Sequence, residues 1–217
     1  MALSSRRTAI GLTLLSALCS PVLAAESSVS GSVQQAVDEA TIVILPARCA
    51  GVIVGDRRSA ITAAHCIGDE RSLDVRLYNG KSVAASIVRV DRQRDVALIR
   101  LDDEVAVRPL VLAEQLPRLG EALYFGGRAD RRGSNQVFAV VKVGRCPSMP
   151  DVDEAIFTNL RARKGDSGAP LVNKSLEVVG LVHGGATCNI AAPTVGLSAA
   201  LGLHGDEGAA RCAWGHC

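Results

Sequence analysis

Three short segments carry a histidine, an aspartate and a serine in settings suited to acyl transfer. They are residues 62–66 (TAAHC), 95–100 (DVALIR) and 165–170 (GDSGAP). A serine hydroxyl is a poor nucleophile at neutral pH, so it needs a base within hydrogen-bond reach, and a histidine, whose ordinary pKa is about 6.5, suits that work. The imidazole in turn needs a carboxylate that holds one tautomer and stabilises its protonated form. The predicted base, orienting carboxylate and nucleophile are His65, Asp95 and Ser167.

Other residues of the same types compete for two of these roles. Asp95 is favoured as the carboxylate because it leads straight into an apolar run, whereas the nearby aspartates stand among charged residues and are typical of solvated turns; they are Asp91, Asp102 and Asp103. A lone histidine is more often structural than catalytic, but the residues flanking His65 favour catalysis. The rival histidines are His183, His204 and His216.

The Gly-Asp-Ser-Gly turn has chemistry of its own. Its glycines allow tight backbone geometry and leave the amides of Gly165 and Ser167 free to point at a developing oxyanion. Losing one such donor typically costs about 100- to 1000-fold in rate. The alternative reading is an ordinary surface turn, because these residue types favour turns wherever they occur.

Short apolar runs separated by turn residues predict the strands that must position these groups. A polar, proline-containing stretch, residues 113–119, divides the strands into two β halves, with His65 and Asp95 on the first and Ser167 on the second. The sequence therefore predicts a site in the cleft between the halves, and no long helix. The predicted strands are 41–45, 50–54, 59–63, 73–78, 83–90, 96–101, 121–125, 136–143, 155–160, 170–172, 178–182 and 194–198.

The amino-terminal residues have the layout of a secretory signal peptide. Arg6 and Arg7 precede an apolar run that ends in small residues, so we expect residues 1–24 to be removed and the protein to be secreted or periplasmic. The run is too short for a membrane anchor, and Leu18 disfavours a lipid on Cys19. Removal takes two of the 24 basic residues and none of the 22 acidic ones, which leaves a formal net charge of zero and no case for nucleic-acid binding. Residues 25–40 are a polar lead or a short prosegment.

Six cysteines remain after export, an even number that suits three disulfides. Cys66 follows His65 directly, so a bridge to Cys49 would pin the histidine's loop and contribute on the order of 3 kcal/mol. In the tail, residues 201–217, a disulfide between Cys212 and Cys217 is favoured over a zinc site with His216, because a fourth ligand is not evident.

Over roughly residues 41–198 the chain resembles the chymotrypsin/trypsin-like serine proteases, with all three motifs present. The resemblance implies an all-β protease domain, residues 41–200, made of two antiparallel six-stranded β-barrels (about 41–112 and about 119–200) with the active site in the cleft between them. It implies a serine endopeptidase that cleaves proteins or peptides without a metal or organic cofactor. Cys49–Cys66 looks like the family's bridge beside the histidine, residues 180–185 like the strand that pairs with substrate backbone, and residues 193–196 like the next strand.

The substrate pocket departs from the trypsin pattern. Arg161 stands six positions before the serine, where trypsin-like members carry an aspartate, so cleavage after lysine or arginine is not expected. Arg163 replaces a cysteine, so Cys188 needs another partner, and Cys146 is the predicted one. A basic cluster beside His183 resembles the logic of glutamyl-specific members, which gives the hypothesis of a preference for acidic residues at P1, the residue before the cleaved bond. The alternative is that the three long basic side chains point to solvent. The predicted substrate-binding residues are Arg161, Arg163, Lys164, His183, Gly184 and Gly185.

Two further departures concern the nucleophile's turn and how it is activated. Ala169 stands where the family usually carries a second glycine. The chain has no Ile-Val-Gly-Gly segment of the kind that supplies zymogen members with a new terminus, so Asp166 needs another partner, and an arginine or backbone amides could serve. Two alternatives to an endopeptidase stay open: a catalytically silent or latent protease-like binding protein, and an esterase with the same triad.

Overall fold

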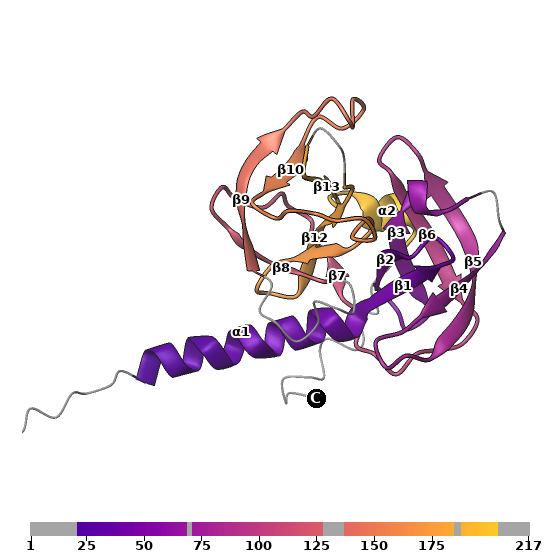
Figure 1. The fold of residues 1–217 in the computed structure, drawn as a ribbon, viewed down its shortest axis with the longest axis horizontal. Coiled ribbons are helices and arrows are strands. Elements are labelled where there is room, and N and C mark those ends of the chain that lie inside the picture. Colours follow the sequence, from indigo (N-terminus) through magenta and orange to yellow (C-terminus); the bar gives the residue numbers. More distant parts are fainter. Residues whose placement is uncertain (1–20, 69–70, 128–136, 185–187, 204–217) are drawn as a thin grey trace, which may run out of the picture.

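The computed structural model describes residues 21–68, 71–127, 137–184 and 188–203 (Figure 1). Most of the predicted signal peptide, Gly185 and the tail with Cys212 and Cys217 lie outside these ranges. Among the helices described, none has the length and apolar character needed to cross a bilayer.

Two barrels lie side by side, and in Figure 1 one runs from indigo to magenta and the other is mostly orange. The first is closed in the order β1-β2-β3-β6-β5-β4. Its strands are β1 (Thr41–Leu45), β2 (Cys49–Ile53), β3 (Ser59–Ala63), β4 (Ser72–Arg76), β5 (Ser82–Asp91) and β6 (Val96–Leu101). All of its pairings are antiparallel.

The second barrel has the order β11-β8-β9-β10-β13-β12 and closes through the pairing of β11 with β12. Its strands are β8 (Ala122–Phe125), β9 (Val137–Gly144), β10 (Ala155–Thr158), β11 (Pro170–Val172), β12 (Glu177–Val182) and β13 (Ile190–Pro193). The predicted pair of antiparallel six-stranded barrels is confirmed. A two-residue strand that was not predicted, β7 (Val111–Leu112), adds to β12 in parallel.

The burial of the strands explains why some read as continuous apolar runs. In β4 only alternate residues are buried, because one face meets solvent. In β2 and β3 every residue is buried. Ile53 and Ala60 point into the first barrel's core, whereas Val52 and Ile61 point into a second cluster that also contains residues of β12 and of both helices. The barrels therefore share a core at the interface on which the site depends.

The prediction of no long helix was wrong, because α1 spans Pro21–Ala40. It packs against β8 and β1 (Figure 1). Val33, Val37 and Ala40 are buried at helical spacing. Gln34 conceals this pattern, since it is polar yet buried: its amide donates to Asp38 Oδ1 at 2.9 Å and to the carbonyl of Phe125 at 3.1 Å. A tertiary contact thus makes a polar segment part of the fold.

The last strand was predicted in the wrong place. Residues 194–198 are not a strand, and neither is 193–196 as a whole, because β13 ends at Pro193 and a short helix, α2 (Leu197–Leu201), follows. Leu197 and Leu201 are buried one helical turn apart in the cluster between the barrels. The true strand is rich in alanine, which has a low strand propensity, so its sequence signal is weak.

Candidate active site

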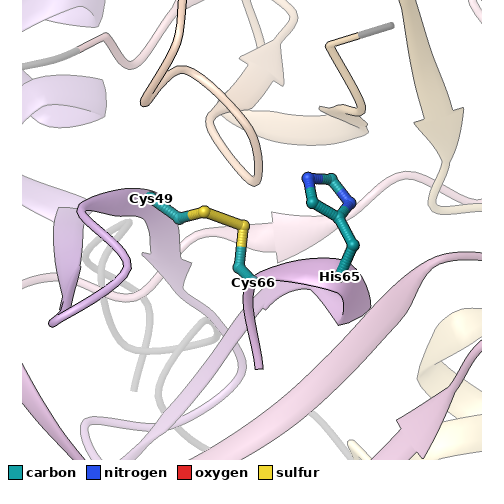
Figure 2. Close-up of side chains that lie close together, drawn as sticks. All are labelled: Cys49, His65 and Cys66. Carbon is teal, nitrogen blue, oxygen red and sulfur yellow. A yellow bond between two sulfur atoms is a disulfide. The ribbon is translucent and has the colours of Figure 1, made fainter. Parts of the chain in front are cut away.

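His65 lies on η1 (Ala64–Cys66), a single helical turn that directly follows β3. The neighbouring Cys66 is joined to Cys49, at the start of β2, with the sulfurs 1.99 Å apart. Figure 2 shows the bridge and the imidazole side by side above this turn. The predicted pairing is present in the structure, and it ties the histidine's turn to the neighbouring strand.

Asp95 holds His65 through both its backbone and its side chain. It lies immediately before β6 with φ 53°, a left-handed conformation that aspartate tolerates better than most residues. Its carbonyl accepts the Ala64 amide at 3.0 Å. Its Oδ1 accepts the His65 amide at 2.9 Å, and its Oδ2 accepts His65 Nδ1–H at 2.8 Å. The proton on Nδ1 is assigned from the carboxylate that accepts it, which leaves Nε2 as the basic atom.

The competing aspartates do not reach His65. Asp102 and Asp103 are exposed, and Asp91 accepts the Arg94 amide in its own turn at 3.0 Å. Asp95 is only 8% exposed. Burial raises the pKa of the Asp95 carboxyl, but hydrogen bonds from His183 and His65 and the attraction of His65 outweigh burial, so the net pKa lies well below its usual range. An ionised carboxylate behind the imidazole is what acyl transfer needs.

Ser167 lies in a tight turn before β11 that is held from both barrels. Its carbonyl accepts the amide of Ala50 in β2 at 2.8 Å, and the next amide, of Gly168, donates to Val182 of β12 at 2.7 Å. Gly165 has φ 94° and Gly168 has φ 79°. A Cβ on Gly168 would lie 2.2 Å from the Ala50 carbonyl oxygen, so only glycine allows this approach. The two barrels meet at the residue after the serine.

Asp166 is fully buried beneath this turn. The Arg163 amide donates to Asp166 Oδ2 at 2.7 Å, and the Asp166 amide donates back to the Arg163 carbonyl at 2.9 Å. From the sequence, an arginine or backbone amides could serve as the partner of Asp166, and the structure shows a backbone amide in this role. Ala169, the mild departure from the family pattern, is buried in the core of the second barrel.

The Ser167 hydroxyl donates to the carbonyl of His183 at 3.2 Å. Within the described ranges no hydrogen bond joins this hydroxyl to His65. A rotation about the serine's χ1 would turn Oγ to another acceptor, and catalytic hydrogen bonds are often long or absent before substrate binds. The structure thus brings His65 and Asp95 into direct contact and leaves Ser167 beside His183.

His183 has a position that the sequence did not reveal. It follows β12, and its Nδ1 lies 2.5 Å from Asp95 Oδ2, the same oxygen that accepts His65 Nδ1–H. The rings of His65 and His183 meet edge to face with centroids 5.2 Å apart. Sequence reasoning treated His183 as a rival base and as a substrate-binding residue, but its ring is turned to Asp95. The contact joins residues 88 positions apart, so no local signal could have predicted it.

The remaining predicted residues fall into three groups. The side chains of Arg161, Arg163 and Lys164 are exposed. Gly184 has φ 75°, and a Cβ there would lie 3.1 Å from Ser167 Oγ, so the glycine leaves room for the Ser167 hydroxyl. Cys146 and Cys188 are bridged, as predicted, with sulfurs 2.05 Å apart.

Two groups of side chains have the residue types and the spacing of metal ligands. Ligand atoms of His65, Asp95 and His183 lie within 4.8 Å of one another, as do those of Cys49, His65 and Cys66. The first set is engaged in the hydrogen bonds to Asp95, and the two sulfurs of the second form a disulfide. These ligand atoms thus already have partners in the structure.

Comparison with known proteins gives the same family. The profile of the family described as a trypsin-like peptidase domain matches residues 49–181, more than half of the chain, and the protein therefore belongs to this family, as predicted. Serine protease HTRA1A of Danio rerio is 30% identical over 137 residues, which are 60% of this chain and 29% of the relative. A probable periplasmic serine endoprotease, DegP-like, of Buchnera aphidicola is 27% identical over 135 residues, 60% of this chain and 28% of the relative.

The chain thus spans less than a third of the length of the curated relatives it matches. Among solved structures, that of Deg5 superimposes with a TM-score of 0.63 at 20% identity, over 81% of this chain and 92% of the other. This likeness concerns the fold.

Proposed function

We propose that the protein is a serine endopeptidase that acylates Ser167, with His65 as general base and acid and Asp95 as the carboxylate that orients it. The observation that carries the proposal is the pair of hydrogen bonds from the amide and the ring of His65 to the Asp95 carboxylate. They leave His65 Nε2 as the proton acceptor and provide a buried negative charge for the imidazolium that forms. The family match supports the same chemistry.

The reaction begins when the Ser167 hydroxyl turns from the His183 carbonyl to His65 Nε2. As Oγ attacks the scissile carbonyl, its proton passes to Nε2 and negative charge develops on the carbonyl oxygen. The amides of Gly165 and Ser167 are the proposed donors to that oxyanion. His65 then gives the proton to the leaving amine, and it activates a water molecule that hydrolyses the acyl-enzyme.

We further propose that substrates carry an acidic residue at P1. The exposed basic side chains before the nucleophile, Arg161, Arg163 and Lys164, support this preference. Gly184 supports an open approach for the substrate backbone beside Ser167. Export to the periplasm or beyond, after loss of residues 1–24, is supported by the two disulfides and by the periplasmic relative.

The test is covalent labelling of the purified, disulfide-intact protein with a fluorophosphonate probe, with the adduct located by peptide mass analysis. We expect labelling at Ser167, its abolition in Ser167→Ala, and a loss of at least about 1000-fold in rate in His65→Ala. The second candidate, a silent or latent binding protein, is favoured by the hydrogen bond from Ser167 to the His183 carbonyl. A folded wild-type protein that is not labelled would support this alternative. Cleavage of activated esters but of no peptide would support the esterase.

A further inference from the structure

His183 contacts both halves of the proposed catalytic machinery. Its ring donates to the carboxylate of Asp95 from the first barrel, and its carbonyl accepts the hydroxyl of Ser167 from the second. Its own backbone is held, since the His183 amide donates to the Ile190 carbonyl of β13 at 2.9 Å. The His183 side chain is 20% exposed, against 42% for that of His65, so it is the more buried of the two histidines.

The carboxylate of Asp95 has three donors, and one of them comes from another part of the chain. The amide and ring of His65 both belong to η1, whereas His183 Nδ1 approaches from the end of β12. Two imidazoles share Oδ2, and an ionised carboxylate can only accept, so each ring carries a proton on Nδ1. His183 therefore holds Oδ2 from the end of β12, whereas both donors of His65 come from η1.

We infer that His183 is a positioning residue: its Nδ1–H holds the Asp95 carboxylate in line with His65, and it does so as a neutral imidazole. This role rests on the proposed function of His65 and Ser167. In the part of the chain that the structure describes, the titratable groups in contact with the His183 ring are Asp95, before β6, and His65, on η1. The ring centroids of His183 and His65 lie 5.2 Å apart. Protonation of His183 would therefore place a second positive charge beside the imidazolium that forms on His65, and would oppose the formation of that imidazolium.

The test compares two substitutions of His183 whose side-chain amides lie at different distances from the backbone. The amide of an asparagine branches from the carbon that carries Nδ1 in histidine, so His183→Asn keeps a donor toward Asp95. In His183→Gln the amide lies one carbon further out and misses that oxygen. We expect the full-length, disulfide-intact Gln variant to react with the fluorophosphonate probe at Ser167 about 10- to 100-fold more slowly than wild type at pH 8, and the Asn variant to react at least ten times faster than the Gln variant.

The pH profile separates positioning from a purely structural role. If both histidines must be neutral, the logarithm of the wild-type labelling rate falls toward acid pH with a slope near two, and that of His183→Asn with a slope near one. Equal rates in Asn and Gln variants of similar unfolding temperature would overturn the positioning role. A slope shared by wild type and His183→Asn would overturn the requirement for the neutral form. Absence of Ser167 labelling in wild type would instead count against the proposed function.

Discussion

The amide of Ala50 donates to the carbonyl of Ser167 at 2.8 Å, and this bond crosses from the first barrel to the second. Ala50 directly follows Cys49, the partner of the cysteine beside His65. Its own carbonyl accepts the Thr62 hydroxyl at 2.6 Å. Two adjacent residues of β2 therefore hold the turn of the proposed nucleophile and the turn of the proposed base.

Gly168, which follows the proposed nucleophile, is the most sensitive point of this contact. Gly168→Ala would set a Cβ 2.2 Å from the Ala50 carbonyl oxygen and 2.5 Å from Thr62 Oγ1 at φ 79°. We expect a loss of about 2–5 kcal/mol in unfolding free energy and a fall of about 100-fold in probe labelling. Gly120→Ala is the matched control, since Gly120 also has φ 79° but a Cβ there meets nothing within 4 Å. It should cost about 1–2 kcal/mol and keep the labelling rate; equal effects of the two substitutions would refute the close approach.

The two disulfides should separate stability from activity. In the chain-entropy model the Cys146–Cys188 bridge, which joins residues 42 apart, contributes about 4 kcal/mol, and the Cys49–Cys66 bridge, 17 apart, about 3 kcal/mol. Replacing Cys49 and Cys66 by alanine should nevertheless lower probe labelling more than replacing Cys146 and Cys188, because Cys66 adjoins His65. Denaturant titration of the two double variants ranks their stabilities, and probe labelling ranks their reaction rates. A larger loss of labelling without Cys146–Cys188 would contradict the role assigned to the bridge beside the base.

The ionised Asp95 should give an acid-dependent stability. Because its pKa is held below the ordinary range, its stabilising effect is fully present above the ordinary value of about 3.9 and is lost as the pH falls toward the folded-state value. The difference in unfolding free energy between wild type and Asp95→Asn should therefore be largest near pH 7 and shrink toward pH 3. Labelling of the variant at pH 8 should fall about 10,000-fold. A stability difference that is constant with pH would exclude an ionic role.

Acidic P1 preference can be tested by charge reversal. Wild-type protein should cleave peptides after glutamate in preference to alanine, phenylalanine or lysine, and Arg161→Glu should reduce that preference 10-fold or more. Arg118→Glu is the control, because Arg118 is also exposed but lies on the segment that connects the barrels. If the control lowers cleavage after glutamate as much as Arg161→Glu does, the preference comes from net charge and not from a pocket.

The end of α1 should remain in the mature protein. Val37 is 0% exposed, so Val37→Ala should lower the unfolding free energy by about 1–3 kcal/mol. Val88→Ala, at a residue 57% exposed, should change it by less than about 0.5 kcal/mol. Mass analysis of the exported protein should find an amino terminus before Val33. A terminus at or after Thr41 would identify residues 25–40 as a removed prosegment.

Local pattern was enough to predict most of the strands. The bounds of β1, β3, β6 and β11 agree with the predicted runs, because short apolar runs and the turn residues that separate them are properties of adjacent positions. The pattern failed where a distant contact changed what a residue does. Gln34 and Asp38 look like a solvated segment until the carbonyl of Phe125 is seen to accept the Gln34 amide.

The sequence by itself determined which residue types could transfer an acyl group, and it singled out Asp95 because that aspartate leads into a buried strand. Only the tertiary structure decided how they meet. The two donors on Asp95 Oδ2 come from η1 and from the end of β12, and the carbonyl of Ser167 accepts the amide of Ala50 in β2. Such contacts depend on how two barrels pack, which no spacing along the chain records.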